Sequence, residues 1–139
     1  MSKVRIGFVG AGSMGQCAHL KNYATLGDCE VVAIAELRRG LREKVAARYA
    51  IPHAYENHEQ MLAYEALDGL VVPQPFTRHS TLIPEVLKAG LPIFTEKPLA
   101  GSIQAADRIL QALKQSGTWH MVGYHKRSDP ATRYAKAEI

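Results

Sequence analysis

Residues 4–15 read VRIGFVGAGSMG, an apolar run followed by three glycines at fixed spacing. The run from Val4 to Val9 is typical of a short buried strand, and residues 14–26 carry apolar side chains at helical spacing. A strand, a G-x-G-x-x-G turn and a helix in this order are the local pattern of a dinucleotide-binding fold. Because glycines gather in many turns, the motif needs support from the rest of the chain.

The three glycines of the motif meet different steric needs. Gly10 permits a tight turn, Gly12 lets the backbone approach a pyrophosphate without an intervening Cβ, and Gly15 allows the helix to pack closely on the strand. The free N–H groups and the positive dipole end of the helix then face the phosphates. The motif therefore predicts a site for the phosphates of a dinucleotide.

An acid stands where the second strand is expected to end. Residues 30–35, EVVAIA, predict that strand, and Glu36 follows directly. It lies about 20 residues after Gly15, the spacing of the acid that binds the adenosine ribose hydroxyls. A carboxylate here repels a 2′-phosphate, so we expect NAD as the cofactor. Arg38 and Arg39 leave NADP open, since either could turn toward a phosphate.

Predicted strands and helices alternate along the rest of the chain, and the strands are apolar on consecutive residues. This pattern is typical of a parallel sheet covered on both faces. We therefore expect a single α/β domain with a doubly wound parallel sheet, a Rossmann fold. The further strands are expected at residues 54–55, 67–72, 91–94 and 119–124, and the further helices at 41–49, 58–64, 80–89 and 103–116. Ser80 and Ser102 are the expected N-caps of the last two helices, with Pro84 in a first turn.

The bulk composition is that of a globular protein, with 139 residues of which 47% are hydrophobic and 22% charged. No apolar run reaches the roughly 20 residues of a membrane helix, and the N-terminus lacks a signal-peptide pattern. Cys17 and Cys29 have neither metal-ligand spacing nor a disulfide framework. We expect a cytoplasmic protein without a metal and without membrane partners.

The net charge of +4 and the pI near 9.2 raise the question of nucleic-acid binding. The basic residues are mostly dispersed among acids, and their densest cluster, residues 38–48, falls on one predicted helix. No interleaved aromatic residues provide a stacking platform for bases. We therefore expect no nucleic-acid partner.

A second distinctive stretch, TEKPL at residues 95–99, follows a predicted strand. In open parallel sheets, ligands bind at the carboxyl ends of the strands, where Glu96 and Lys97 are placed. Beside a nicotinamide, Lys97 could hydrogen-bond the oxygen on the carbon that exchanges the hydride. Glu96 could hold Lys97 or contact the nicotinamide ribose, and Pro98 could fix the turn through a cis peptide. A surface lysine followed by a turn proline is the structural alternative.

Three segments, GFVGAGSMG, HSTLIPEVLKAGLPIFTEKPLA and VGYHKRSDP, resemble the N-terminal domain of the glucose–fructose oxidoreductase, inositol dehydrogenase and rhizopine-catabolism family in order and spacing. The resemblance implies that Lys97 is the catalytic residue and that His125 or Arg127 faces the active site. It also implies that the loop VPQPFTRH, with Pro73 and His79, passes beside the cofactor. A structural role for His79 at the helix start is an equal alternative.

The resemblance further implies an NAD(P)-dependent enzyme that transfers a hydride between the cofactor and a sugar, polyol or related hydroxy compound. Members of the family carry a second α/β domain, and Asp129-Pro130 begins a helix for which the sequence shows no stop. We expect residues 1–125 to form the dinucleotide-binding domain and residues 126–139 to lead toward a missing substrate domain. A naturally short protein with a frayed last helix is the alternative. Without a substrate domain, the isolated chain is expected to be inactive and the full-length protein a homo-oligomer. A non-catalytic dinucleotide-binding sensor or partner module is the alternative.

The candidate site residues fall into two groups. Those expected to bind the cofactor are Gly10, Gly12, Ser13, Met14, Gly15, Glu36, Arg38, Pro73, His79 and Glu96. Those expected on the substrate side are Lys97, His125 and Arg127. Neither the identity of the substrate nor the direction of the reaction follows from the sequence.

Overall fold

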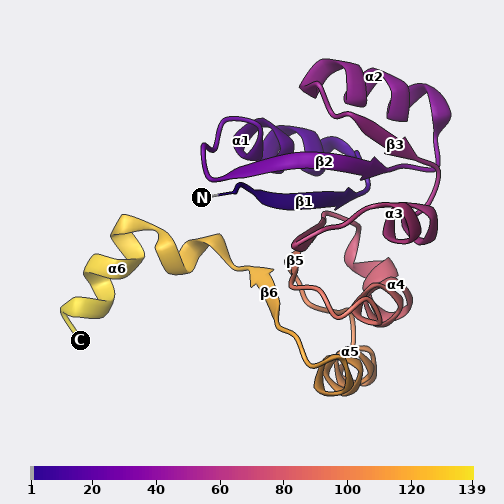
Figure 1. Cartoon of the computed structure of the whole chain (residues 1–139). Coiled ribbons are helices and arrows are strands. Elements are labelled where there is room, and N and C mark those ends of the chain that lie inside the picture. Colours follow the sequence, from indigo (N-terminus) through magenta and orange to yellow (C-terminus); the bar gives the residue numbers. More distant parts are fainter. Residues whose placement is uncertain (1) are drawn as a thin grey trace.

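The computed structural model describes residues 2–139, and its centre is a six-stranded parallel sheet (Figure 1). The strand order is β3-β2-β1-β4-β5-β6, so the direction of winding reverses between β1 and β4. The strands are β1 Val4–Val9, β2 Cys29–Ala35, β3 His53–Tyr55, β4 Gly69–Val72, β5 Ile93–Glu96 and β6 His120–Gly123. This is the doubly wound sheet predicted from the sequence, and ligands bind such sheets beside the point of reversal.

Helical segments connect the strands in the predicted alternation. They are η1 Gly15–Leu20, α1 Lys21–Tyr23, α2 Arg39–Tyr49, α3 His58–Tyr64, η2 Phe76–Arg78, α4 His79–Leu87, α5 Ile103–Ser116, η3 His125–Ser128 and α6 Pro130–Ala137. Segment η1 is a π-helix and runs directly into α1, whereas η2 and η3 are single 3₁₀ turns.

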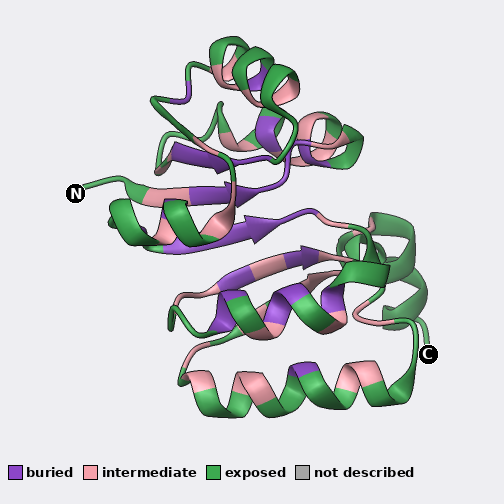
Figure 2. Cartoon of the chain, turned by 90° about the vertical axis from the view of Figure 1, so that its right-hand side faces the viewer, coloured by how far each residue is buried: buried purple, intermediate pink, exposed green. Residues whose placement is uncertain are grey.

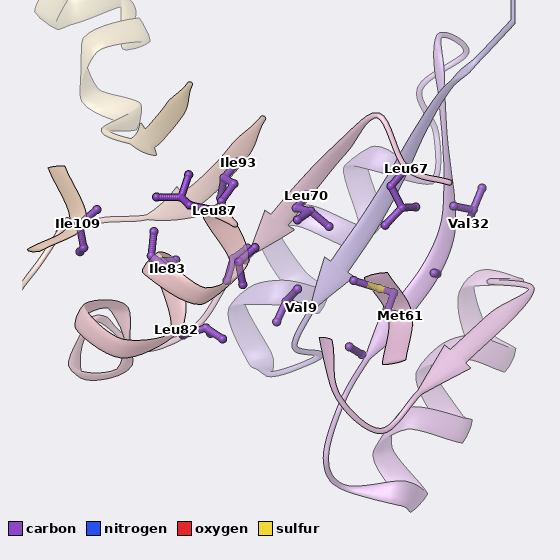
Figure 3. Packing of buried hydrophobic residues seen from close by; sticks show 14 residues of the cluster. Val9, Val32, Met61, Leu67, Leu70, Leu82, Ile83, Leu87, Ile93 and Ile109 are labelled. Carbon is purple, nitrogen blue, oxygen red and sulfur yellow. The ribbon is translucent and has the colours of Figure 1, made fainter. Parts of the chain in front are cut away.

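Two hydrophobic clusters lie on opposite faces of the sheet because successive strand residues point to opposite sides. In β4, for example, Leu70 and Val72 belong to one cluster and Val71 to the other. The α3–α5 cluster contains Val9, Val32, Met61, Leu67, Leu70, Leu82, Ile83, Leu87, Ile93 and Ile109 among others (Figure 3). The α1–α2 cluster contains Phe8, Ala11, Leu20, Ile34, Val45, Ile51 and Val71. The central strand β4 is accordingly buried along its whole length, as are the ends of β1 and β2, whereas the edge strands β3 and β6 contain no buried residue (Figure 2).

The starts of several elements differ from the prediction by one or two residues, and for two of them the physical reason is clear. Pro92 has no N–H to donate to a sheet ladder, so β5 begins at Ile93 and extends to Glu96. Helix α4 begins at His79, directly after the 3₁₀ turn η2, so Ser80 lies inside the helix and is not its N-cap. Pro84 consequently lies in the helix interior and not in the first turn. By contrast, Ser102 caps α5 as predicted, with its side chain accepting the Ala105 N–H at 3.2 Å.

The last helix stands apart from the sheet (Figure 1). Asp129 caps it as predicted, accepting the N–H groups of Ala131 and Thr132, and Pro130 is its first residue. Every residue of α6 is exposed. Within residues 2–139, no helix combines the length and the apolar character needed to cross a membrane.

Candidate functional site

The glycine turn after β1 shows what a Cβ atom would meet at each of the three glycines. Gly10 has a φ of +106°, and a Cβ there would overlap the side-chain amide of Gln74. A Cβ on Gly15 would lie 3.0 Å from Cγ of Pro73, so the helix packs closely on the loop after β4. At Gly12 a Cβ would meet no atom within 4 Å. The backbone is therefore open at Gly12, where the motif predicts the approach of a pyrophosphate.

A cavity of about 590 Å³ lies where β1, β2 and β4 end. Five of the predicted cofactor-binding residues line it, namely Gly10, Gly12, Glu36, Arg38 and Pro73. The remaining lining comes largely from the first residues of α3 and from the loop and helix after β4. The cavity thus joins the glycine turn to the acid after β2, as the sequence spacing predicts.

Glu36 is held tightly in this cavity and is 7% exposed. Its carboxylate accepts the Ala11 N–H at 3.0 Å and the Arg38 N–H at 3.1 Å, and the Arg38 Nε donates to it at 2.8 Å. Burial by itself would raise the pKa of Glu36, but the hydrogen bonds from Arg38 and Ala11 and the charge of Arg38 lower it to about 2. Glu36 therefore carries a full negative charge at neutral pH.

A second hollow of about 560 Å³ is lined by cations and lies on the other side of Arg38. Lys21, Arg38 and Arg48 line it together with Gly12 and the predicted Ser13. Arg38 is 66% exposed at its side chain and contributes to both hollows. Arg39, in contrast, pairs with Glu43 at 2.8 Å along the exposed side of α2.

Five further predicted residues meet in a groove of about 780 Å³ at the ends of β5 and β6. Met14 from the glycine motif lines this groove together with Glu96, Lys97, His125 and Arg127. The turn after β5 contains a cis peptide bond between Lys97 and Pro98, in agreement with the sequence-based expectation. Lys97 is exposed, and in the described part of the chain its ammonium group forms no ion pair.

The carboxylate of Glu96 is engaged by a residue that the sequence did not single out. Nε2 of His19 in η1 lies 2.7 Å from Oε1 of Glu96, and the backbone N–H of Lys97 donates to Oε2 at 3.2 Å. Glu96 therefore holds the backbone of Lys97 and not its ammonium group. The only sequence signal for His19 is its position one turn after Gly15, on the face of the helix that meets the sheet.

His79 is fully buried and lies outside these hollows. Its Nδ1 lies 3.0 Å from the Leu99 carbonyl oxygen and its Nε2 lies 3.0 Å from the Gln74 carbonyl oxygen. The imidazole thus joins the loop after β4 to the turn after β5. This geometry favours the structural alternative for His79, and direct contact of its side chain with the cofactor is not supported.

A cluster of potential metal ligands lies at the rim of the first cavity. His58, Glu59 and Glu85 bring ligand atoms within 4.8 Å of one another. The two ring nitrogens of His58 face the two carboxylates at 3.4 and 3.7 Å, which is an ion-pair arrangement, and both acids are exposed. We assign no metal to this cluster. The sequence did not connect its members because they lie on α3 and α4.

Comparison with known proteins adds to this geometry. Residues 4–124 match the oxidoreductase family with an NAD-binding Rossmann fold. The chain is 29% identical over 138 residues to scyllo-inositol 2-dehydrogenase (NAD(+)) of Bacillus subtilis, covering 99% of this chain and 40% of the relative. It is 30% identical over 138 residues to inositol 2-dehydrogenase of Acidothermus cellulolyticus, covering 98% of this chain and 40% of the relative.

The fold is shared with the WlbA dehydrogenase from Bordetella pertussis, whose crystal structure is a complex with NADH and UDP-GlcNAcA. The TM-score is 0.90 at 26% identity, covering 98% of this chain and 41% of that chain. The chain thus spans about 40% of the length of the curated relatives given above. The family match confirms both the predicted fold and the resemblance seen in the sequence. This chain therefore belongs to the glucose–fructose oxidoreductase, inositol dehydrogenase and rhizopine-catabolism family of oxidoreductases, of which residues 4–124 form the NAD-binding Rossmann domain.

Proposed function

We propose that this chain is the cofactor-binding part of an enzyme that transfers a hydride between NAD(P) and a sugar, polyol or related hydroxy compound. The observation that carries the proposal is that Lys97 and Met14 line one groove, so the candidate catalytic lysine lies beside the dinucleotide motif. The substrate class is supported by the relatives named as inositol dehydrogenases and by the dehydrogenase solved with a sugar nucleotide.

The residues present fit a dinucleotide in two respects. The backbone at Gly12 is unobstructed, and the ionised Glu36 offers acceptors to ribose hydroxyls. When bound, NAD(P) supplies the hydride acceptor or donor. Gly10, Gly15 and Pro73 shape the turn, while Ser13 and Met14 begin the helix whose N-terminus faces the phosphates.

Lys97 is the residue that would act on the substrate. Its ammonium group is free to hydrogen-bond the substrate oxygen, stabilise negative charge as it develops there and pass a proton. His125 and Arg127 line the same groove and are exposed, so they can contact the hydroxyl groups of a substrate. In this proposal Lys97 acts on the reacting oxygen, and His125 and Arg127 orient the substrate.

The choice between NAD and NADP depends on Glu36 and Arg38. Glu36 repels a 2′-phosphate, which favours NAD. The cation-lined hollow with Ser13, Lys21, Arg38 and Arg48 supports NADP as the second candidate, because an anion there would gain several charge-assisted contacts. The pairing of Arg38 with Glu36 leads us to propose NAD as the preferred cofactor.

Calorimetric titration of the chain with NADH and with NADPH tests the cofactor proposal. Tighter binding of NADH is the expected result. Tighter binding of NADPH would show that the cation-lined hollow decides the preference between NAD and NADP. If the chain bound neither NADH nor NADPH, the proposal would be contradicted.

Replacing Lys97 by Met in the full-length enzyme tests the catalytic role. We expect kcat to fall by at least about 100-fold, the contribution typical of a general acid–base group, while NADH affinity changes less than about twofold. Unchanged turnover would show that Lys97 is not the catalytic residue. Absence of turnover in the unaltered full-length protein would support the alternative of a non-catalytic dinucleotide-binding sensor or partner module. A homo-oligomeric full-length protein, a cytoplasmic location and the absence of nucleic-acid and membrane partners remain predictions.

A further inference from the structure

We propose that His19 is a positioning residue for Glu96 and, through it, for the turn that carries Lys97. The inference rests on the proposed function, since it concerns the nicotinamide side of the same site. It assigns His19 a role in holding the carboxylate that faces the nicotinamide half of the cofactor.

The contact between the two side chains is short and sheltered. His19 Nε2 lies 2.7 Å from Glu96 Oε1, and the side chains are 11% and 17% exposed. The His19 ring packs edge-on against Phe94 of β5, with the ring centroids 5.1 Å apart. Because Phe94 lies two residues before Glu96 on the same strand, the ring and the carboxylate are oriented by one rigid element.

The helix that carries His19 is unusual. Residues 15–20 form a π-helix, and such wider turns are frequent at functional sites. Leu20, the next residue, is fully buried in the α1–α2 cluster, whereas His19 reaches the groove. The π-helix begins at Gly15, the last glycine of the motif, and His19 contacts Glu96 at the end of β5. The helix therefore connects the glycine motif to the end of β5.

Glu96 retains capacity to bind a ligand while His19 holds it. Each carboxylate oxygen can accept two hydrogen bonds, and His19 and the Lys97 N–H use one on each oxygen. The remaining lone pairs are available to the nicotinamide ribose hydroxyls. Without the His19 donor, the carboxylate is free to rotate away from the groove, and the adenosine half of the site, around Glu36, is unaffected.

If His19 positions Glu96, its loss should weaken binding of NADH but not of ADP, whereas a purely structural role would affect both ligands equally. The His19→Leu variant removes the donor, and the His19→Gln variant keeps a side-chain N–H. We expect His19→Leu to weaken NADH binding by about tenfold, the effect of one hydrogen bond to a charged group, while the affinity for ADP stays within about twofold. His19→Gln should bind NADH within about threefold of the unaltered chain.

Calorimetry with ADP and with NADH on the same preparations decides the matter, with thermal unfolding as a check on folding. Unchanged NADH binding by His19→Leu, or equal weakening of ADP and NADH, would overturn the positioning role. If His19→Leu does not fold, His19→Asn serves in its place, because its shorter side chain does not reach Glu96. If the unaltered chain binds neither ADP nor NADH, the proposed function is contradicted, and the role of His19 is contradicted with it.

Discussion

Glu36 shows how one residue can hold two parts of the fold together and still line a cavity. Its carboxylate joins the glycine turn to the start of α2 and still lines the first cavity. Since its pKa of about 2 lies below the ordinary value of 4.5, the ionised form stabilises the fold above about pH 4.5. That contribution is lost as the pH falls toward 2. The carboxylate that we propose for binding the adenosine ribose is therefore fully ionised at neutral pH.

His120 gives a pH effect in a milder range. Burial, with a smaller contribution from the charge of His79, lowers the pKa of His120 from 6.5 to about 4. Its Nε2 lies 2.8 Å from the buried Thr95 hydroxyl. Between pH 6.5 and about 4 the unfolded chain binds a proton that the folded chain does not, so stability falls as the pH falls through this range.

We predict that His120→Gln makes the free energy of unfolding less dependent on pH, since Gln retains a hydrogen bond to Thr95 and does not titrate. For the unaltered chain, this group should cost on the order of 1 kcal/mol between pH 7 and pH 5, after allowance for its partial exposure. Urea unfolding at the two pH values measures the difference. Between pH 7 and pH 8 the two proteins should differ by a constant amount, and parallel losses below pH 6.5 would contradict the prediction.

At the scale of elements, two glycines of the same turn are expected to have different roles: Gly10 in stability and Gly12 in binding. We predict that Gly10→Ala lowers the free energy of unfolding by at least about 1–2 kcal/mol, because φ is +106° and the new Cβ would displace Gln74. Gly12→Ala, the matched variant, adds a Cβ into open space and should change stability by less than about 1 kcal/mol.

For NADH binding, the variant expected to show the effect is Gly12→Ala, the one that should leave stability nearly unchanged. Gly12→Ala places a methyl group where the pyrophosphate is expected, so NADH affinity should fall by about tenfold or more in a folded protein. Urea unfolding and calorimetry of both variants provide the measurements. A stable Gly12→Ala chain with unchanged NADH affinity would show that the pyrophosphate does not approach the turn at this residue.

Helix starts were predictable where the cap is local and not where tertiary contacts set the start. Ser102 caps α5 because its side chain reaches the N–H of Ala105 within one turn. The start of α4 depends instead on the buried His79, whose ring nitrogens face carbonyl oxygens from two different loops. The local cap rule for Ser80 therefore failed at a position where one of the two contacts, to Leu99, comes from 20 residues further along the chain.

At the scale of the whole molecule, the sheet divides the core into two independent parts. We predict that Ile34→Val in the α1–α2 cluster and Ile83→Val in the α3–α5 cluster each cost about 0.5–1.5 kcal/mol. Because the two residues lie in separate clusters on opposite faces, the double variant should lose the sum of the two, within about 0.5 kcal/mol.

A pair within one cluster is the control for this prediction. Ile83 on α4 and Ile109 on α5 belong to the same cluster, and the two helices pack together. Ile83→Val combined with Ile109→Val should therefore depart from additivity more than the first pair does. Urea unfolding of the single and double variants measures both couplings, and equal coupling in the two pairs would argue against separate clusters.

The sequence by itself determined the alternation of strands and helices, the doubly wound sheet and the position of Lys97 at the end of a strand. These features follow from hydrophobic periodicity and from the sterics of single residues such as Gly10, which act over a few positions of the chain. Family membership was inferred separately, from the resemblance of three segments of the sequence to a known family.

Only the tertiary structure decided how the candidate residues are grouped and which partners hold them. The contact between His19 and Glu96 joins residues 77 positions apart. The ring of His79 is held between the carbonyl oxygens of Gln74 and Leu99, and Leu99 lies 20 positions further along the chain. Glu36 lines the first cavity, Lys97 lines the groove at the ends of β5 and β6, and the cation-lined hollow is a third space. Strand order, and not sequence distance, sets which strand ends are neighbours. Pairing of side chains across a sheet edge depends on the packing of the whole domain, and no local pattern in the sequence specifies it.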